Sequence, residues 1–179
     1  MAAMTTTARK GFLFVLMLGM ALLSSSTAHA QGGVYATYTT ATMTNIAGNV
    51  PQMNGATVGI FVQDRRKRVF KGGVDFRGNL LNGKYGTSSN QGLAGLRLVW
   101  SPRHTNIYPY AEFLVGVAHS LLFTNGKGET LFMSAFVGGV DYKLARHVDW
   151  RVVDFTYSQI NASDPFNPVM VGTGLVARF

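Results

Sequence analysis

Apolar and polar residues alternate along most of the chain after residue 30, and the alternation is clearest over the last eleven residues, 169–179. Valine, threonine, leucine, alanine and phenylalanine fill one uncharged face there, whereas the other face carries a single charge, Arg178. No helical period is sustained beyond residue 30. The pattern predicts an all-β protein whose last strand has a face suited to lipid.

Clusters of turn-forming residues divide the chain into eight predicted strands, at 33–41, 56–63, 68–78, 91–100, 107–120, 130–144, 148–158 and 169–179. The connections alternate strictly between long ones (42–55, 79–90, 121–129, 159–168) and short ones (64–67, 101–106, 145–147). Bacterial outer-membrane barrels have this layout, with short periplasmic turns and longer external loops. We therefore expect an eight-stranded antiparallel up-and-down transmembrane β-barrel in a Gram-negative-type outer membrane, with both termini periplasmic.

In most predicted strands that carry several charges, the charged residues share one face. A shift of register moves all side chains of a strand together, so it cannot create this agreement. Lys71, Asp75 and Arg77 agree in the third strand, and the sixth strand behaves in the same way. In the seventh strand Asp154 breaks the alternation that Asp149 and Arg151 set. One extra residue at Val152-Val153, a β-bulge, would return Asp154 to the charged face and leave Phe155 and Tyr157 on the other.

The charged face is expected to point into the barrel. Eleven charges facing lipid would cost roughly 20–40 kcal/mol at ~2–4 kcal/mol each, more than the ~5–15 kcal/mol by which proteins are stable. The interior of an eight-stranded barrel is just wide enough for side chains to fill, so paired charges predict a plug rather than a pore. The predicted interior ionic network consists of Lys71, Asp75, Arg77, Arg97, Glu112, Asp141, Lys143, Asp149, Arg151, Asp154 and Arg178.

Other features leave more than one interpretation open. Five inward glycines either make room for long Arg and Lys side chains or permit barrel curvature; they are Gly59, Gly95, Gly116, Gly139 and Gly174. The first strand is too mixed in composition to orient. An interfacial aromatic girdle is expected at the short-turn end from Trp100, Tyr108, Tyr142 and Trp150.

Part of the excess positive charge, +8 over the whole sequence, lies at the short turns, in 65–68, Arg103 and Arg146. A basic rim on that side would bind the anionic headgroups of outer-membrane lipids. Runs of this kind also occur in nucleic-acid-binding proteins. The neighbouring membrane strands and the predicted export signal argue against nucleic acid as a partner.

The first thirty residues predict a cleaved secretory signal peptide. Arg9-Lys10 is followed by 13 apolar residues and by the small-residue site Ala28-His29-Ala30. A retained transmembrane helix needs about 20 apolar residues, so that alternative is disfavoured. Cleavage would leave residues 31–179 as a single barrel domain. The sequence has no cysteine, so stability is expected from the hydrogen-bond ladder and not from disulfides.

From Gly72 to Phe179 the chain resembles the OmpA-type eight-stranded outer-membrane barrel family, most closely in Gly138-Gly139-Val140-Asp141-Tyr142 and in Asp149-Trp150-Arg151. The resemblance implies that Asp141 and Arg151 join an ionic cluster inside the barrel. A second acidic residue often follows the arginine by two positions in that family, whereas here Asp154 follows by three. We expect the likeness to cover the barrel alone, with no peptidoglycan-binding domain and no anchoring role.

The carboxy-terminal strand also resembles the signal by which the outer-membrane assembly machinery recognises its clients. That resemblance makes the assembly machinery an expected partner. The residues that would carry the signal are Val171, Thr173, Leu175, Ala177 and Phe179.

The expected function is a non-enzymatic one, in envelope integrity or in surface interaction through four external loops. A lipid A deacylase-like enzyme is the first alternative, because His119-Ser120 precede Glu129 by about ten residues; adjacent strand residues face opposite ways, which disfavours a triad. A soluble lipocalin-like carrier would need its charges outside the barrel, and an open channel would need an interior without paired charges. No metal, cofactor or nucleotide motif is present.

Overall fold

The computed structural model describes residues 30–44, 52–66, 69–84, 87–102, 104–120, 129–161 and 167–179. The chain divides into two compact units, residues 1–30 and 31–179. Most of the predicted signal peptide, including Ala28, lies outside the described residues, so its cleavage stays a prediction. In the described segments, no helix has the length and apolar character needed to cross a membrane.

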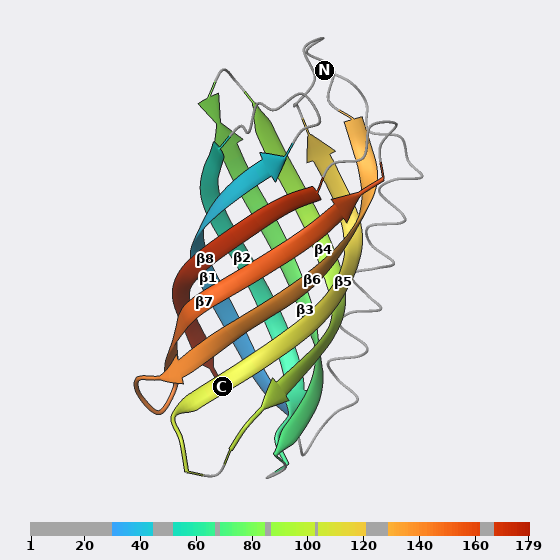
Figure 1. Cartoon of the computed structure of the whole chain (residues 1–179). Coiled ribbons are helices and arrows are strands. Elements are labelled where there is room, and N and C mark those ends of the chain that lie inside the picture. The colour runs from blue at the N-terminus through green and yellow to red at the C-terminus, as the bar shows by residue number, and fades with distance from the viewer. Residues whose placement is uncertain are drawn as a thin grey trace, which may run out of the picture. The chain divides into compact units, whose positions relative to one another are not determined.

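Eight strands form a closed antiparallel barrel (Figure 1). Each strand is bonded to the next, and the first and last strands pair along their length to close the sheet. This architecture confirms the predicted up-and-down barrel. The strands are β1 (Ala30–Thr44), β2 (Gln52–Asp64), β3 (Phe70–Gly83), β4 (Ser88–Trp100), β5 (Ile107–Ser120), β6 (Glu129–Lys143), β7 (Val148–Ile160) and β8 (Asn167–Arg178).

Several strands extend further into the predicted long connections than the sequence suggested. β3 continues to Gly83 and β4 begins at Ser88, although Asn and Ser residues there were interpreted as turn signals. Their side chains instead bond one another inside the barrel: Asn79 Nδ2 donates to Gln91 Oε1 at 2.8 Å, and Gln91 Nε2 donates to Ser89 Oγ at 3.2 Å. Polar residues continue the ladder here because the barrel interior satisfies their side chains.

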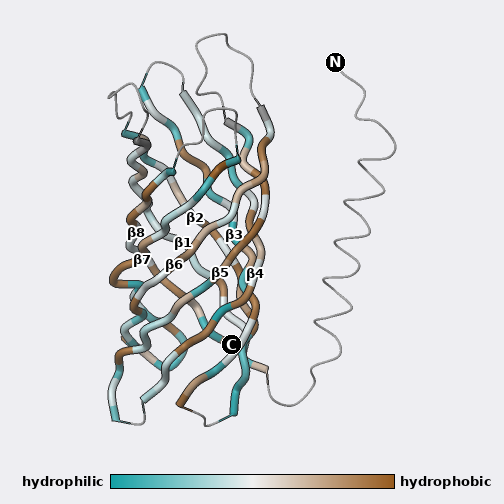
Figure 2. The backbone as a smooth tube through the Cα atoms, turned by 45° about the vertical axis from the view of Figure 1, so that its right-hand side comes forward, coloured by the Kyte–Doolittle hydropathy of each residue, from teal (hydrophilic) through white to brown (hydrophobic). Residues whose placement is uncertain are grey.

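The outward face of the barrel is apolar. Except for Asp64 at the end of β2, the outward positions of the eight strands hold no Asp, Glu, Lys or Arg. Brown apolar segments alternate with pale and teal ones along the tubes in Figure 2. β1, which the sequence could not orient, places Tyr35, Thr37 and Thr39 inside and Tyr38 outside.

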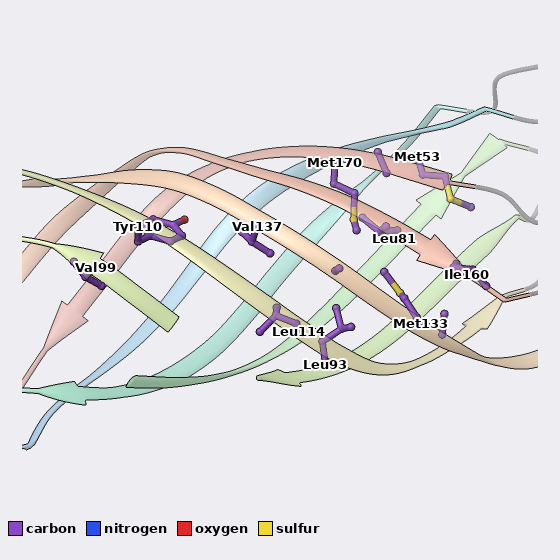
Figure 3. Close-up of a cluster of buried hydrophobic side chains, with 13 residues drawn as sticks. Met53, Leu81, Leu93, Val99, Tyr110, Leu114, Met133, Val137, Ile160 and Met170 are labelled. Atoms are coloured by element: carbon purple, nitrogen blue, oxygen red, sulfur yellow. The ribbon is translucent and has the colours of Figure 1, made fainter. Parts of the chain in front are cut away.

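The interior has two layers along the barrel axis. Toward the long-connection ends of the strands, buried apolar side chains form a cluster that includes Met53, Leu81, Met133, Ile160 and Met170 (Figure 3). Toward the short-turn ends the buried side chains are mostly charged. The alternation had predicted the charged layer, whereas the apolar layer was not anticipated.

The register of β6 against β7 shifts by one residue at the position where the sequence required a bulge. Val140 lies opposite Val153, but Asp141 lies opposite Arg151, which leaves Val152 as the extra residue. β7 shows the same irregularity against β8. Asp154 is consequently buried, while Phe155 and Tyr157 are exposed on the outward face.

Candidate functional site

The charged interior is centred on Asp141, whose carboxylate is fully buried. It accepts hydrogen bonds from three guanidinium groups that lie on three other strands. Arg151 Nε donates to Oδ1 at 3.0 Å, and Oδ2 accepts from Arg97 Nη2 at 3.1 Å and from Arg178 Nη2 at 3.2 Å. Charge-assisted bonds of this kind are the strongest hydrogen bonds in proteins, so Asp141 ties β4, β7 and β8 to β6.

Arg77 forms a second centre, deeper along the barrel axis. It donates to Glu112 Oε2 at 2.6 Å and to Asp154 Oδ1 at 3.1 Å, and it lies 3.5 Å from Asp75 Oδ1. Arg97 joins the two centres because it bonds the other oxygen of Glu112 as well as Asp141. Arg151 joins them again through Asp154, at 3.3 Å. The ion pairs therefore form one continuous network.

The structure brings nine of the eleven predicted network residues together. Four guanidinium groups bond five carboxylates, and Asp149 enters the network through Arg178. Lys71 and Lys143 also stand at inward positions, but neither has an ion pair among the described residues. They lie instead in the mouth of the barrel, at the short-turn end.

Three aromatic rings pack between the arginines, and sequence reasoning did not identify them as interior residues. Arg151 stacks over Tyr35 at 4.0 Å from the ring centroid, and Arg97 stacks over Tyr110 at 4.1 Å and Phe61 at 4.5 Å. The two tyrosine hydroxyls also donate to Asp75 (2.8 Å) and Asp154 (2.6 Å). Tyr110 could have been assigned to the interior from the sequence, because it lies two residues from Glu112 and so shares its face of the strand. β1 has no charged residue that would have oriented Tyr35 in the same way.

The inward glycines make room for these rings and for neighbouring backbone. A Cβ on Gly59 would lie 2.4 Å from the Tyr35 ring, and one on Gly139 would lie 2.3 Å from the Tyr110 hydroxyl. At the other three predicted positions the closest atom is a carbonyl oxygen of the adjacent strand, at 1.9–2.0 Å, for Gly95, Gly116 and Gly174. The nearest atoms to each Cβ belong to tyrosine rings or backbone and not to Arg or Lys side chains.

A cavity of about 110 Å³ opens at the short-turn end of the barrel. Each of the eight strands contributes one lining residue, so the cavity occupies the mouth itself. In strand order these are Gln31, Gln63, Lys71, Val99, Tyr108, Lys143, Asp149 and Arg178, with Ser101 and Arg146 from the adjoining turns.

No family model and no curated protein sequence matches the chain. Among solved structures, the barrel is similar to that of neisserial surface protein A (NspA), with a TM-score of 0.54 and 16% identity over 83% of this chain and 97% of that one. This likeness, together with the strand order, decides the fold. The chain is a transmembrane-type β-barrel. Membership of the OmpA-type family stays a prediction.

Two further solved structures align with the barrel at lower scores. Ail of Yersinia pestis has a TM-score of 0.49 and 12% identity, over 85% of this chain and 100% of that one. The N-terminal β-barrel domain of Pseudomonas aeruginosa OprF has a TM-score of 0.46 and 13% identity, over 84% of this chain and 99% of that one.

Three of the four residues of the predicted aromatic girdle face outward at the short-turn end of the barrel: Trp100, Tyr142 and Trp150. Trp150 Nε1 also donates to Thr173 Oγ1 on the outer face of β8, at 3.1 Å. The assignment of Tyr108 to the girdle is wrong. Its parity is that of Tyr110, so it lines the mouth, 5.7 Å from the Arg178 guanidinium.

The predicted basic rim is described only in part. Arg65, Arg66 and Arg146 are exposed at the short turns. Residues 67, 68 and 103 lie outside the described residues. The carboxy-terminal strand places its uncharged face outward, as the alternation requires, and Phe179 is three-quarters exposed.

The residues behind the enzyme alternative do not form a described triad. His119 is exposed, and its Nδ1 lies 2.9 Å from Thr130 Oγ1. The side chains of Ser120 and Glu129 lie outside the described part of the structure. Over the described ranges, no group of three or more His, Cys, Asp or Glu side chains has a metal-binding arrangement.

Proposed function

We propose that this protein is a non-enzymatic integral protein of a bacterial outer membrane, whose barrel is closed to solute flow. The observation that carries the proposal is the distribution of side chains, which is the reverse of that in an ordinary globular protein. Ion pairs are buried inside the barrel, and the outer surface is apolar and uncharged. Its role would be structural, in envelope integrity, and its external loops would serve surface interaction.

The apolar outer surface supports a lipid environment. Large hydrophobic side chains stand exposed on all eight strands, among them Leu96 at 67%, Phe136 at 61% and Leu175 at 56%. A monomer in water rarely exposes a continuous apolar patch larger than a few hundred Å². A closed sheet leaves no unpaired edge, which is the condition for strands to lie in hydrocarbon. The orientation is the reverse of the one that a soluble lipocalin-like carrier requires.

The two filled layers of the interior support closure. The ionic network spans the lumen through bonds that link opposite strands, such as β3 with β7 through Arg77 and Asp154. Above it, the apolar side chains of Leu81, Leu114 and Met133 are fully buried. An ion crossing the barrel would have to displace both layers. Eight strands leave no further width for it.

The proposed location in the outer membrane is supported by the export signal and by the loop layout that the sequence predicts. NspA, a neisserial surface protein by name, shares the fold. On this proposal the short turns and both termini face the periplasm, and the long connections face the outside. The assembly machinery would recognise β8 through the uncharged face that ends in Phe179.

Expression of the full chain in a Gram-negative host, followed by membrane fractionation, tests the proposal. We expect an outer-membrane band whose gel mobility changes on boiling, because a closed barrel resists detergent until heated. Protease added to whole cells should cut only within the long connections. A soluble periplasmic product without a mobility shift would contradict the proposal.

Closure is tested separately in planar lipid bilayers with the purified barrel. We expect no steady conductance above that of the bare bilayer. A variant with Leu81, Leu114 and Met133 changed to Ala keeps the ionic layer and serves as a control for the apolar one. Stable open steps in the unmodified protein would show a channel.

A further inference from the structure

The mouth cavity is built as a ring. Because each strand contributes one residue, eight of the ten lining residues are held by the barrel itself, and Ser101 and Arg146 come from the adjoining turns. The cavity volume of about 110 Å³ is enough for several water molecules or for one small oxyanion. Four of its lining residues can donate hydrogen bonds without carrying charge: Gln31, Gln63, Ser101 and Tyr108.

The lining is strongly unbalanced in charge. Lys71, Lys143, Arg146 and Arg178 face a single carboxylate, Asp149. That carboxylate is already bonded by the Arg178 guanidinium. Neither lysine nor Arg146 has an ion pair among the described residues. Three cations that have no ion pair among the described residues therefore line the cavity.

The buried network does not cancel this excess. It holds four guanidinium groups and five carboxylates, so adding the two lysines and Arg146 gives seven positive charges against five negative ones. Asp64, a carboxylate at the rim, interacts electrostatically with Lys71 and accepts a hydrogen bond from the backbone N of Arg66 at 2.9 Å. The exposed Arg65 and Arg66 beside it outweigh its charge.

Lys71 differs from an ordinary surface lysine. It occupies an inward position near the start of β3 and is only partly exposed. A lysine held inside a ring of like charges is destabilised by repulsion and by lost hydration. A bound anion would offset both costs, because ammonium, guanidinium and hydroxyl groups would all donate to its oxygens.

We propose that the mouth of the barrel binds one phosphate-type oxyanion, either free inorganic phosphate or the phosphate of an anionic phospholipid headgroup. Lys71 and Lys143 supply the charge, and Tyr108 and Arg146 supply further donors. Arg178 remains committed to Asp149 and Asp141 and shapes the inner wall of the site.

The first arm of the test titrates inorganic phosphate into the folded barrel in a non-ionic detergent, with phosphorus NMR as the readout. We expect Lys71→Gln and Lys143→Gln each to weaken phosphate binding by about fivefold, which corresponds to the ~1 kcal/mol that one lysine contributes near an anionic group. Lys71→Arg should retain binding. Lys84→Gln, an exposed lysine beyond the other end of β3, removes the same charge away from the mouth and should change nothing.

The second arm reconstitutes the barrel in phosphatidylcholine with a minor share of phosphatidylglycerol and counts the phosphatidylglycerol retained after delipidation. Phosphate binding that depends on Lys71 and Lys143 identifies free phosphate as the ligand. Retained phosphatidylglycerol with the same dependence, without phosphate binding, identifies the headgroup. The proposal is overturned if neither phosphate nor phosphatidylglycerol binds, or if the Lys84 variant loses as much binding as the Lys71 and Lys143 variants. Heat-modifiable gel mobility verifies that each variant is folded.

Discussion

Asp141 shows how a single carboxylate can hold a barrel interior together. A buried ion pair contributes little net stability against a well-packed apolar pair, because desolvation offsets most of the attraction. Removing one partner is different, since the remaining charges are left buried without a counter-ion. Asp141 has three guanidinium partners and no exposure, so its loss removes one charge-assisted bond from each of three guanidinium groups at once.

Asp141→Asn should therefore destabilise the barrel by about 3–5 kcal/mol. Urea unfolding in vesicles, followed by the fluorescence of Trp100 and Trp150, measures the change. Asp64→Asn is the matched control at the rim and should stay within about 0.5 kcal/mol. Equal effects at the two sites would mean that the network has no special role in stability.

Gly138 and Gly139 are neighbours with opposite surroundings. A Cβ on Gly139 would meet the Tyr110 hydroxyl and the Val153 carbonyl oxygen, at 2.3 Å and 2.5 Å, whereas one on Gly138 would meet nothing within 4 Å. We expect Gly139→Ala to destabilise by about 1–3 kcal/mol, since the interior is filled.

Gly138→Ala should be close to neutral in the same unfolding assay. This pair separates steric room from strand flexibility, because both substitutions remove a glycine from the same strand. Comparable losses at 138 and 139 would favour the curvature interpretation of these glycines.

At the scale of the element, β7 depends on one extra residue. Without the bulge at Val152, Asp154 would stand on the apolar outward face, and Phe155 and Tyr157 would face the ionic network. Both changes oppose folding, since Asp154 currently bonds Arg77, Arg151 and Tyr110.

Deletion of Val152 should abolish the heat-modifiable folded band. The substitution Val152→Ala, which keeps the residue count and changes only an outward side chain, should retain it. If the deletion variant folds with unchanged mobility, the register of β7 is not set by the bulge.

The elements differ in how far the sequence predicted them. Charges were decisive for β3, β6 and β7, because a charge strongly prefers one face of a membrane strand, and parity then oriented its neighbours. β1 has no charge, and Tyr or Thr fits either face, so the inward position of Tyr35 could not be derived. The apolar layer around Met133 was missed for a related reason: a hydrophobic residue suits both lipid and a dry interior. Strand ends at the long connections were placed short because Asn and Ser resemble turn signals until their interior partners are known.

At the scale of the whole molecule, the barrel reverses the arrangement of an ordinary globular protein, in which apolar side chains lie inside and charged ones outside. The outward positions hold apolar side chains, and the inward positions hold the charge, with the basic mouth at one end and the apolar cluster at the other. The central claim is that the outer face lies in lipid. It concerns Leu96 and Phe136 most directly, since both are highly exposed and stand near the middle of their strands.

The absence of cysteine from the sequence allows one direct measurement. Single variants Leu96→Cys, Phe136→Cys and Lys84→Cys are labelled with an environment-sensitive fluorophore and reconstituted in vesicles. We predict that nitroxide on the lipid acyl chains quenches the labels at 96 and 136, and that aqueous iodide quenches only the label at 84. Quenching at 96 and 136 by iodide and not by the lipid would contradict the membrane-spanning barrel.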